Sequence, residues 1–154
     1  MAYLLDTNVV SELRKPKPHG AVLAWLREQP AHALYLSAMT IVEIQRGIEI
    51  TRAQDTARAE QLEGWLVVEL IPNAQILAMD APVARAWAKL MHKRSDTLTE
   101  DALIAATALT HRLTVVSRNV RDFIALGVAC VNPFEVNPEV DGIPQTAAKK
   151  NGAP

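Results

Sequence analysis

The chain has 154 residues, of which 49% are hydrophobic and 21% charged, and its sixteen basic and seventeen acidic residues leave a formal charge of −1. A chain of this length forms one domain whose core needs no covalent cross-link. Cys130 is the only cysteine, which excludes an internal disulfide and a cysteine-rich zinc site and favours a reducing compartment. Because the net charge is close to zero, a nucleic-acid partner would need a local basic surface.

The N-terminus argues against export, because Asp6 stands where a signal peptide carries its apolar stretch. No uncharged apolar run approaches the roughly 20 residues that a membrane-spanning helix needs. We therefore expect a cytoplasmic protein that does not cross a membrane. The four histidines are scattered without the HExxH spacing, so a histidine-based zinc site is not supported.

Short apolar runs alternate with longer segments of helical period, a pattern typical of a parallel sheet covered by helices. In chain order the first half predicts strand 3–5, a short helix to Leu13, helix 21–29, strand 33–36, helix 40–50 and helix 55–68. The second half predicts strand 76–79, a helix from Asp80 to about Lys93, helix 99–111, strand 114–117, helix 119–126 and strand 128–131. The pattern leaves open whether 76–79 pairs at the sheet edge.

Local signals support several of these boundaries. Ser37 and Asp80 are placed to cap the helices that follow them, and Gly127 is placed to end the helix before it. Residues 136–154 lack any period and are predicted to be a disordered tail. The folded domain is therefore expected to span 1–135.

Two carboxylates in the first half of the chain occupy positions that solubility alone does not explain. Asp6 directly follows the apolar strand 3–5, and its structural alternative is the N-cap of the next helix. Glu43 sits among apolar residues of helix 40–50, and its structural alternative is a helical ion pair with Arg46. Each alternative is a common role, so neither carboxylate identifies a functional site by itself.

Asp101 is the most informative carboxylate, because it opens a helix that is apolar on every side and therefore predicted to be buried. Its structural alternative is an interaction with the helix dipole, worth about 0.3–1 kcal/mol, which Glu100 could supply from a more exposed position. A further polar group lies where strand 114–117 ends: the strand ends in Ser117 and is followed by Asn119 and Asp122. A loop with capping residues would also explain that group.

Considered together, these residues predict a metal site. Asp6 and the segment 117–122 both follow strands, and in open α/β sheets ligands bind at the carboxyl ends of the strands. Two carboxylates ~4 Å apart repel by about 4 kcal/mol at an effective dielectric of 20, so a converging set must bind a cation or a proton. Oxygen ligands favour Mg²⁺ or Mn²⁺, which can activate water for attack on a phosphodiester.

Four segments carry a family resemblance: LLDTNVVSEL at 4–13, TIVEIQRG at 40–47, EDALIAATAL at 100–109 and SRNVRDF at 117–123. In this order and spacing they resemble the PIN-domain ribonucleases and, among these, the toxins of VapBC-type toxin–antitoxin pairs. The segment VACVNPFEV at 128–136 resembles the last strand of the family. The four segments together are a strong signal, although each alone is weakly specific.

The resemblance assigns roles to six residues. It implies that the metal-binding positions are Asp6, Glu43, Asp101 and Asp122, with Mg²⁺ as the cofactor and Mn²⁺ as a substitute. Ser117 matches a hydroxyl position and Asn119 a polar position beside that site. Members of the family usually carry Thr where Ser117 stands, but the hydroxyl is kept.

The resemblance also implies a fold and partners. The fold would be a three-layer α/β/α structure with a parallel sheet in the order 3-2-1-4-5. The partners would be an RNA substrate, a second copy of the chain in a homodimer, and a small VapB-like antitoxin that blocks the site and is a candidate DNA-binding component of the complex. The expected activity is endoribonuclease cleavage of RNA phosphodiesters.

Alternative functions stay open at this point. A phosphatase of the haloacid dehalogenase type would need an aspartate where Asn8 stands, and the six glycines form no nucleotide-binding loop. A stand-alone PIN RNA-processing nuclease and a catalytically inactive PIN-fold interaction module are the remaining alternatives. The basic residues near the expected site are Arg14, Lys15, Lys17, Arg46, Arg118 and Arg121, and the three tryptophans are expected in the core or an interface.

Overall fold

The computed structural model describes residues 1–135 and has the predicted α/β architecture. Five strands form one parallel sheet in the order β3-β2-β1-β4-β5. The strands are β1 Tyr3–Leu5, β2 Leu34–Ser37, β3 Ile76–Leu77, β4 Thr114–Val116 and β5 Cys130–Val131. The strand order implied by the family resemblance is confirmed. The tail predicted for residues 136–154 lies outside the described residues.

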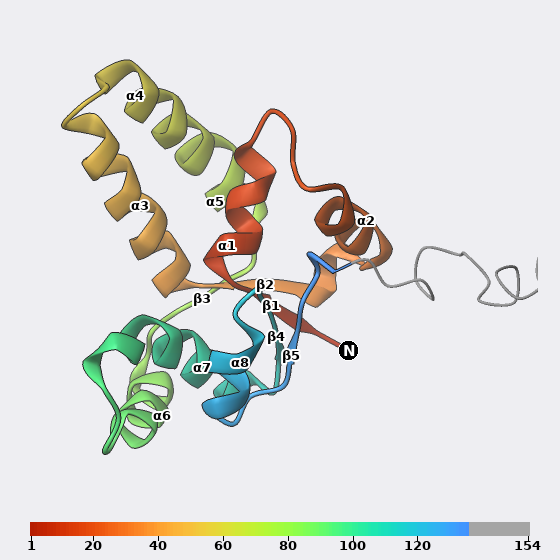
Figure 1. Ribbon diagram of the computed structural model, residues 1–154, viewed down its shortest axis with the longest axis vertical. Coiled ribbons are helices and arrows are strands. Elements are labelled where there is room, and N and C mark those ends of the chain that lie inside the picture. The colour runs from red at the N-terminus through yellow and green to blue at the C-terminus, as the bar shows by residue number, and fades with distance from the viewer. Residues whose placement is uncertain (136–154) are drawn as a thin grey trace, which may run out of the picture.

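Helices cover both faces of the sheet and give the three predicted layers (Figure 1). One face carries α1 Thr7–Val10, η1 Ser11–Arg14, α2 Gly20–Glu28, α3 Ala38–Arg52, α4 Thr56–Gly64, η3 Trp65–Leu70 and α5 Ile71–Asn73. The other face carries α6 Ala81–Met91, α7 Thr99–His111 and α8 Val120–Ala125. Two short 3-10 turns that the pattern does not predict complete the fold, η2 Ala31–Ala33 and η4 Asp96–Leu98. Within residues 1–135, no helix is long and apolar enough to span a membrane.

The central strand β1 is buried on both faces, which explains its unbroken apolar sequence. Leu4 packs in a cluster with Ile104 and Phe123 on the α7 and α8 side. Its neighbour Leu5 packs in a second cluster with Val9 and Val22 on the α1 and α2 side. The first polar residue after this strand, Asp6, therefore lies at the carboxyl end of the central strand.

The predicted boundary signals are confirmed. Ser37 Oγ accepts a hydrogen bond from the Met39 backbone N at 3.1 Å at the start of α3. Asp80 Oδ1 accepts from the Val83 backbone N at 3.2 Å at the start of α6. Gly127 has a φ of 81° just after α8, a left-handed conformation that suits glycine.

Two predicted strands are shorter than expected. Segment 76–79 pairs only over Ile76–Leu77, where it lies parallel to β2, so its place at the sheet edge is established. Segment 128–131 contributes only Cys130–Val131, paired with β4. Both are edge strands, and short edges limit unwanted pairing with other chains.

Two helical predictions also need correction. The predicted helix 55–68 ends as an α-helix at Gly64 and continues as the π-helical turn η3, whose wider backbone pattern a hydrophobic period does not reveal. Helix α7 has the predicted bounds and buries Ala102 and Ile104–Ala108, but Leu109 is 42% exposed. The burial of α7 therefore does not extend to its last turn.

Candidate active site

The candidate site lies where the central strands β1 and β4 end. Leu5 is paired with Val116, and the next residues along each strand are Asp6 and Ser117. The Asp6 backbone N donates to the Val116 carbonyl oxygen at 2.9 Å, which continues the strand pairing by one residue. The topology therefore brings Asp6 and Ser117 together although they are 111 positions apart in sequence.

Asp6 fills two roles at once, because its two carboxylate oxygens have different partners. Oδ1 accepts from the Thr7 backbone N at 2.7 Å, so the N-cap alternative is correct for this oxygen. Oδ2 accepts from Ser117 Oγ at 2.6 Å. Asp6 is only 4% exposed, and burial raises its pKa despite the opposing effect of the Ser117 and Thr7 hydrogen bonds.

Ser117 is fully buried and links the two strand ends. While its hydroxyl donates to Asp6, its oxygen accepts from the Asn119 backbone N at 2.9 Å. Asn119 begins α8, but its side chain makes no capping hydrogen bond, so capping does not explain this residue. The hydroxyl at position 117 therefore orients Asp6.

Asn8 belongs to the same network, and sequence reasoning missed it. Its Nδ2 donates to Asp6 Oδ2 at 3.3 Å and to Ser117 Oγ at 3.2 Å, and its Oδ1 accepts from the Arg118 backbone N at 3.3 Å. The sequence did contain a signal, because Asn8 lies two residues after Asp6 in the segment that follows strand 3–5. From the sequence alone, Asn8 was used only to exclude a phosphatase. An amide two residues after a strand-end carboxylate can fix both that carboxylate and a neighbouring loop.

Glu43 lies on α3, is half-buried and forms no ion pair within the described part of the chain. Burial raises its pKa to about 7, together with the negative charges of Asp6, Glu100 and Asp101, while the Thr7 hydroxyl acts in the opposite direction. The expected ion pair with Arg46 is wrong, because the Arg46 guanidinium instead contacts Glu100 on α7. Oε1 of Glu43 is a buried atom without a hydrogen-bond partner among residues 1–135.

Asp101 and Asp122 approach the same region from the other face of the sheet. Asp101 is half-buried in the first turn of α7, and burial raises its pKa to about 6, with further contributions from the charges of Asp6, Asp122 and Glu100. Asp122 is exposed in the first turn of α8. Because the charge of Asp6 acts on both Glu43 and Asp101, the structure brings the predicted carboxylates to one region.

The donor set fits a hard divalent cation, although the carboxylates do not form a closed set of ligands. Among residues 1–135, no three Asp, Glu, His or Cys side chains are grouped as a metal site would be. Oε1 of Glu43 is nevertheless a buried acceptor in need of a positive partner, and its neighbours Asp6 and Asp101 are also oxygen donors. Buried anionic oxygens that repel one another suit Mg²⁺ or Mn²⁺.

The remaining predicted residues have mixed roles. Lys15 pairs with Glu12 at 2.9 Å, and the Arg118 guanidinium lies 3.9 Å from the centre of the Phe134 ring, so both are partly engaged within the chain. Arg14 lines a cavity beside the acidic residues. The three tryptophans pack against the hydrophobic clusters, as expected of core residues.

Comparison with known proteins shows the family to which the chain is similar. The family model described as PIN domain matches residues 3–128. VapC ribonuclease Y4jK of Sinorhizobium fredii is 38% identical over 138 residues, which cover 86% of this chain and 97% of that protein. Toxin FitB of Neisseria gonorrhoeae is 37% identical over 139 residues, covering 85% of this chain and 97% of that protein.

The solved structures agree with the sequence relatives. A structure of FitAB bound to an IR36 DNA fragment contains a chain that superposes with a TM-score of 0.76 at 33% identity, over 88% of this chain and 97% of that chain. The family model spans most of the described residues, and the sequence relatives are covered over nearly their whole length. The chain belongs to the PIN domain family.

Proposed function

We propose that the protein is a cytoplasmic, Mg²⁺-dependent endoribonuclease that acts as the toxin of a VapBC-type toxin–antitoxin pair. The observation that carries the proposal is the buried Oε1 of Glu43, which has no hydrogen-bond partner within residues 1–135 and lies beside two further carboxylates. A buried carboxylate without a partner is costly unless a cation or a proton neutralises it, and a divalent cation would neutralise Glu43 and its acidic neighbours together. Family membership and the relatives named VapC ribonuclease and Toxin FitB support RNA as the substrate and toxicity as the role.

Each residue of the site would have its own role. Asp6, Glu43, Asp101 and Asp122 would hold one or two divalent ions. When bound, Mg²⁺ or Mn²⁺ lowers the pKa of a water and offsets the charge that develops on the scissile phosphodiester. Ser117 keeps Oδ2 of Asp6 in place by donating to it, and its own oxygen is fixed by the Asn119 backbone N.

Asn8 acts as a second positioning residue in this scheme. Its amide donates to both Asp6 and Ser117, and its carbonyl oxygen holds the loop that leads to α8. Asp122 lies on that helix, so Asn8 connects the buried carboxylate to the exposed one. Orientation by neighbouring hydrogen bonds commonly changes metal affinity or activity by about 10–100-fold.

The partners follow from the same family assignment. We propose that two copies of the chain form a homodimer and that a small VapB-like antitoxin occupies the acidic site. An arginine of the antitoxin would suit a carboxylate cluster, because a guanidinium forms bidentate pairs with carboxylates. The related FitAB was solved bound to DNA, which supports a DNA-binding role for the complex of toxin and antitoxin.

The test measures RNA cleavage, the dependence of cleavage on divalent ions, and the effect of the protein on cell growth. The purified chain should cut RNA with Mg²⁺ or Mn²⁺ and stop in EDTA, and Glu43→Gln should lose the cleavage that the exposed control Glu60→Gln keeps. Induction of the chain alone should arrest growth, and the gene beside it should restore growth.

Other outcomes would replace the proposal. Cleavage without arrest of growth would favour a stand-alone RNA-processing nuclease. No cleavage with any divalent ion would favour an inactive interaction module. A monomer in light scattering would remove the homodimer from the proposal.

A further inference from the structure

A cavity of about 220 Å³ lies directly beside the acidic residues and shares Glu43 with them. Its walls come from three separate stretches of the chain, namely the α1–η1 segment, helix α3 and the α4–η3 segment. The lining residues that matter for its chemistry are Thr7, Ser11, Arg14, Gly47, Thr51 and Trp65. An occupant of this cavity would therefore lie next to the group that is cleaved at the acidic site.

Gly47 keeps part of this cavity open. It lies inside helix α3, where glycine is less stable than alanine because it loses more backbone freedom on folding. The backbone does not require glycine, since Gly127 is the glycine of positive φ among residues 1–135. A Cβ built on Gly47 would meet nothing within 4 Å. The fold would accept a side chain here, and what glycine preserves is the space.

The cavity lining combines a cationic, a hydroxyl and an aromatic side chain, a combination that suits a nucleotide. Among the described residues, no carboxylate forms an ion pair with the Arg14 side chain, so its charge is available to a phosphate. Ser11 offers a hydroxyl group for a sugar or a base edge, whereas the Thr51 hydroxyl donates to the Gly47 carbonyl oxygen at 2.9 Å and is left to act as an acceptor. Trp65 is only partly covered by the core and offers an aromatic surface. Arginine, hydroxyls and an aromatic ring together are the groups that bind single-stranded RNA.

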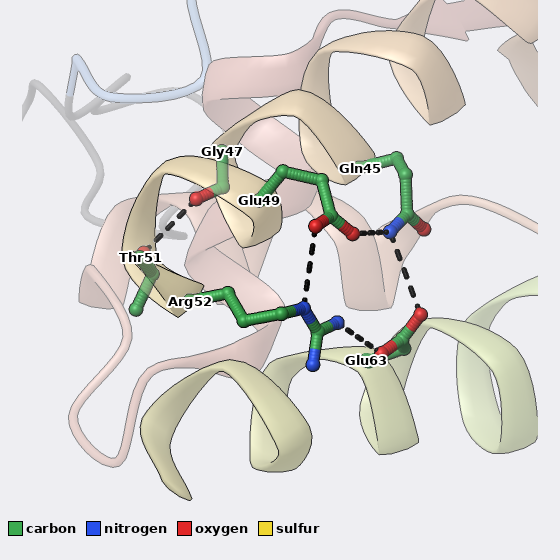
Figure 2. A network of polar contacts seen from close by, with 6 residues as sticks. All are labelled: Gln45, Gly47, Glu49, Thr51, Arg52 and Glu63. Atoms are coloured by element: carbon green, nitrogen blue, oxygen red, sulfur yellow. Dashed lines mark hydrogen bonds and ion pairs between the residues drawn. The ribbon is translucent and has the colours of Figure 1, made fainter. Parts of the chain in front are cut away.

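The walls of the cavity are held together by a polar network between α3 and α4 (Figure 2). The Arg52 guanidinium donates to Glu49 Oε2 at 3.2 Å and also contacts Glu63 on α4. Gln45 Nε2 donates to Glu49 Oε1 at 3.0 Å and to Glu63 Oε1 at 3.5 Å. Helix α4 continues into η3, which carries Trp65, so the network fixes one wall of the cavity relative to the other.

We infer that this cavity binds one nucleotide of the RNA substrate, adjacent to the phosphodiester that is cleaved. The inference rests on the proposed ribonuclease function and adds to it the place where the neighbouring base is read. Arg14 contacts the phosphate of this nucleotide, and the base lies against Trp65 over the space left by Gly47. The identity of the bases at the cut site is then set partly by this cavity.

The test fills the cavity without touching the carboxylates. Gly47→Leu is compared with Gly64→Leu, because Gly64 is also helical, also has nothing within 4 Å of a built Cβ, and does not line the cavity. A labelled pool of random-sequence RNA serves as the probe, and the cut sites are sequenced. Gly47→Leu should lower kcat/KM by roughly tenfold or more, the loss expected when one stacked base is displaced, and should change the base preference beside the cut.

The control variant and the metal response make the result specific. Gly64→Leu should cleave at the same sites and with the same kcat/KM as the unmodified chain. Both variants should keep the rise in melting temperature that Mn²⁺ produces, because the carboxylates are unchanged. A second variant, Arg14→Gln, should raise KM, weaken the salt dependence of RNA binding and leave kcat nearly unchanged, since it removes one phosphate contact.

The possible failures can be told apart. If the unmodified chain cuts RNA but Gly47→Leu cuts it with the same efficiency and base preference, the inference is wrong and the proposed function stands. If Gly47→Leu loses antitoxin binding and keeps cleavage, the cavity belongs to the antitoxin and the inference is again wrong. If the unmodified chain cuts no RNA, the proposed function fails and the inference fails with it.

Discussion

The two halves of the acidic site are held in different ways. On the strand side, Asp6 uses both oxygens in hydrogen bonds with Thr7, Ser117 and Asn8. On the helix side, Glu43 has a buried oxygen without a partner in the described part of the chain. Strand ends therefore provide a fixed carboxylate, whereas the helices provide carboxylates that need something further to neutralise them.

The difference indicates how the site works. A carboxylate that is fully hydrogen-bonded is positioned before any ligand arrives. A carboxylate that lacks a partner contributes repulsion until a ligand arrives, and then contributes binding energy. The strand side should therefore control geometry, and the helix side should control the response to metal ions.

The largest effect should come from a change on the helix side. Asp101→Asn removes one candidate ligand, and we expect kcat/KM for RNA to fall by more than about 100-fold, beyond the loss of a merely orienting partner. The stability of the metal-free protein should be unchanged or higher, because the substitution relieves repulsion from Asp6 and Asp122. Cleavage assays in Mg²⁺ and melting in EDTA check both parts, and retained cleavage would remove Asp101 from the site.

On the strand side, Ser117→Ala should lower cleavage by about 10–100-fold, because it frees Oδ2 of Asp6 from its orienting donor. It also leaves the Asn119 backbone N without its acceptor, at a cost of about 1–3 kcal/mol in unfolding free energy. Ser117→Thr keeps the hydroxyl and should restore most of the activity. Loss of stability without loss of cleavage would show that Ser117 is structural only.

Divalent ions should stabilise the folded chain, because the assembled carboxylates exist only in that state. A concentration 100 times the Kd should add about 2.7 kcal/mol to the free energy of unfolding. Melting curves with increasing Mn²⁺ measure this, and Glu43→Gln should reduce the shift while Ser117→Ala should reduce it less. Equal shifts in the two variants would contradict the proposed division between the two halves of the site.

Much of the fold follows from local signals in the sequence. The apolar run that ends at Asp6, the caps at Ser37 and Asp80, and the apolar helix 99–111 each predict an element that the structure contains. The sheet order came from the family resemblance, since parallel strands can be arranged in several orders. The π-helical turn η3 and the short edge strands depend on tertiary packing, which a hydrophobic period does not encode.

The site was predictable in part for similar reasons. Asp6 and Ser117 could be paired because both directly follow strands. The true partner of Arg46 could not be predicted, because the nearby Glu43 lies on the same helix whereas Glu100 lies far along the chain. Asn8 was missed because an amide near a carboxylate has many roles, and its contact with Ser117 appears only when the strands are aligned.

The smallest predicted effect is a pH dependence, to which the helix-side carboxylates and the buried Asp6 contribute in the same direction, because the pKa of each is raised. The pKa of Glu43 is raised to about 7 and that of Asp101 to about 6, each above its ordinary value. The native state therefore holds more protons than the unfolded state between about pH 4 and pH 7, and stability falls as the pH rises through this window. Both groups are half-exposed, so solvent screening limits the effect to a few degrees of melting temperature.

The sign of this effect reverses when a metal ion is bound. In EDTA the chain should melt at a higher temperature at pH 5 than at pH 8, and Glu43→Gln should flatten that difference while Glu60→Gln leaves it intact. Carboxylates that bind a cation must be deprotonated, so the stabilisation by Mn²⁺ should be larger at pH 8 than at pH 5. Glu12 and Glu49 cannot produce this loss of stability, because their pKa values are lowered and such groups favour the folded state as the pH rises. A metal-free chain that becomes more stable from pH 5 to pH 8 would show that the helix-side carboxylates are already neutralised by groups within the fold.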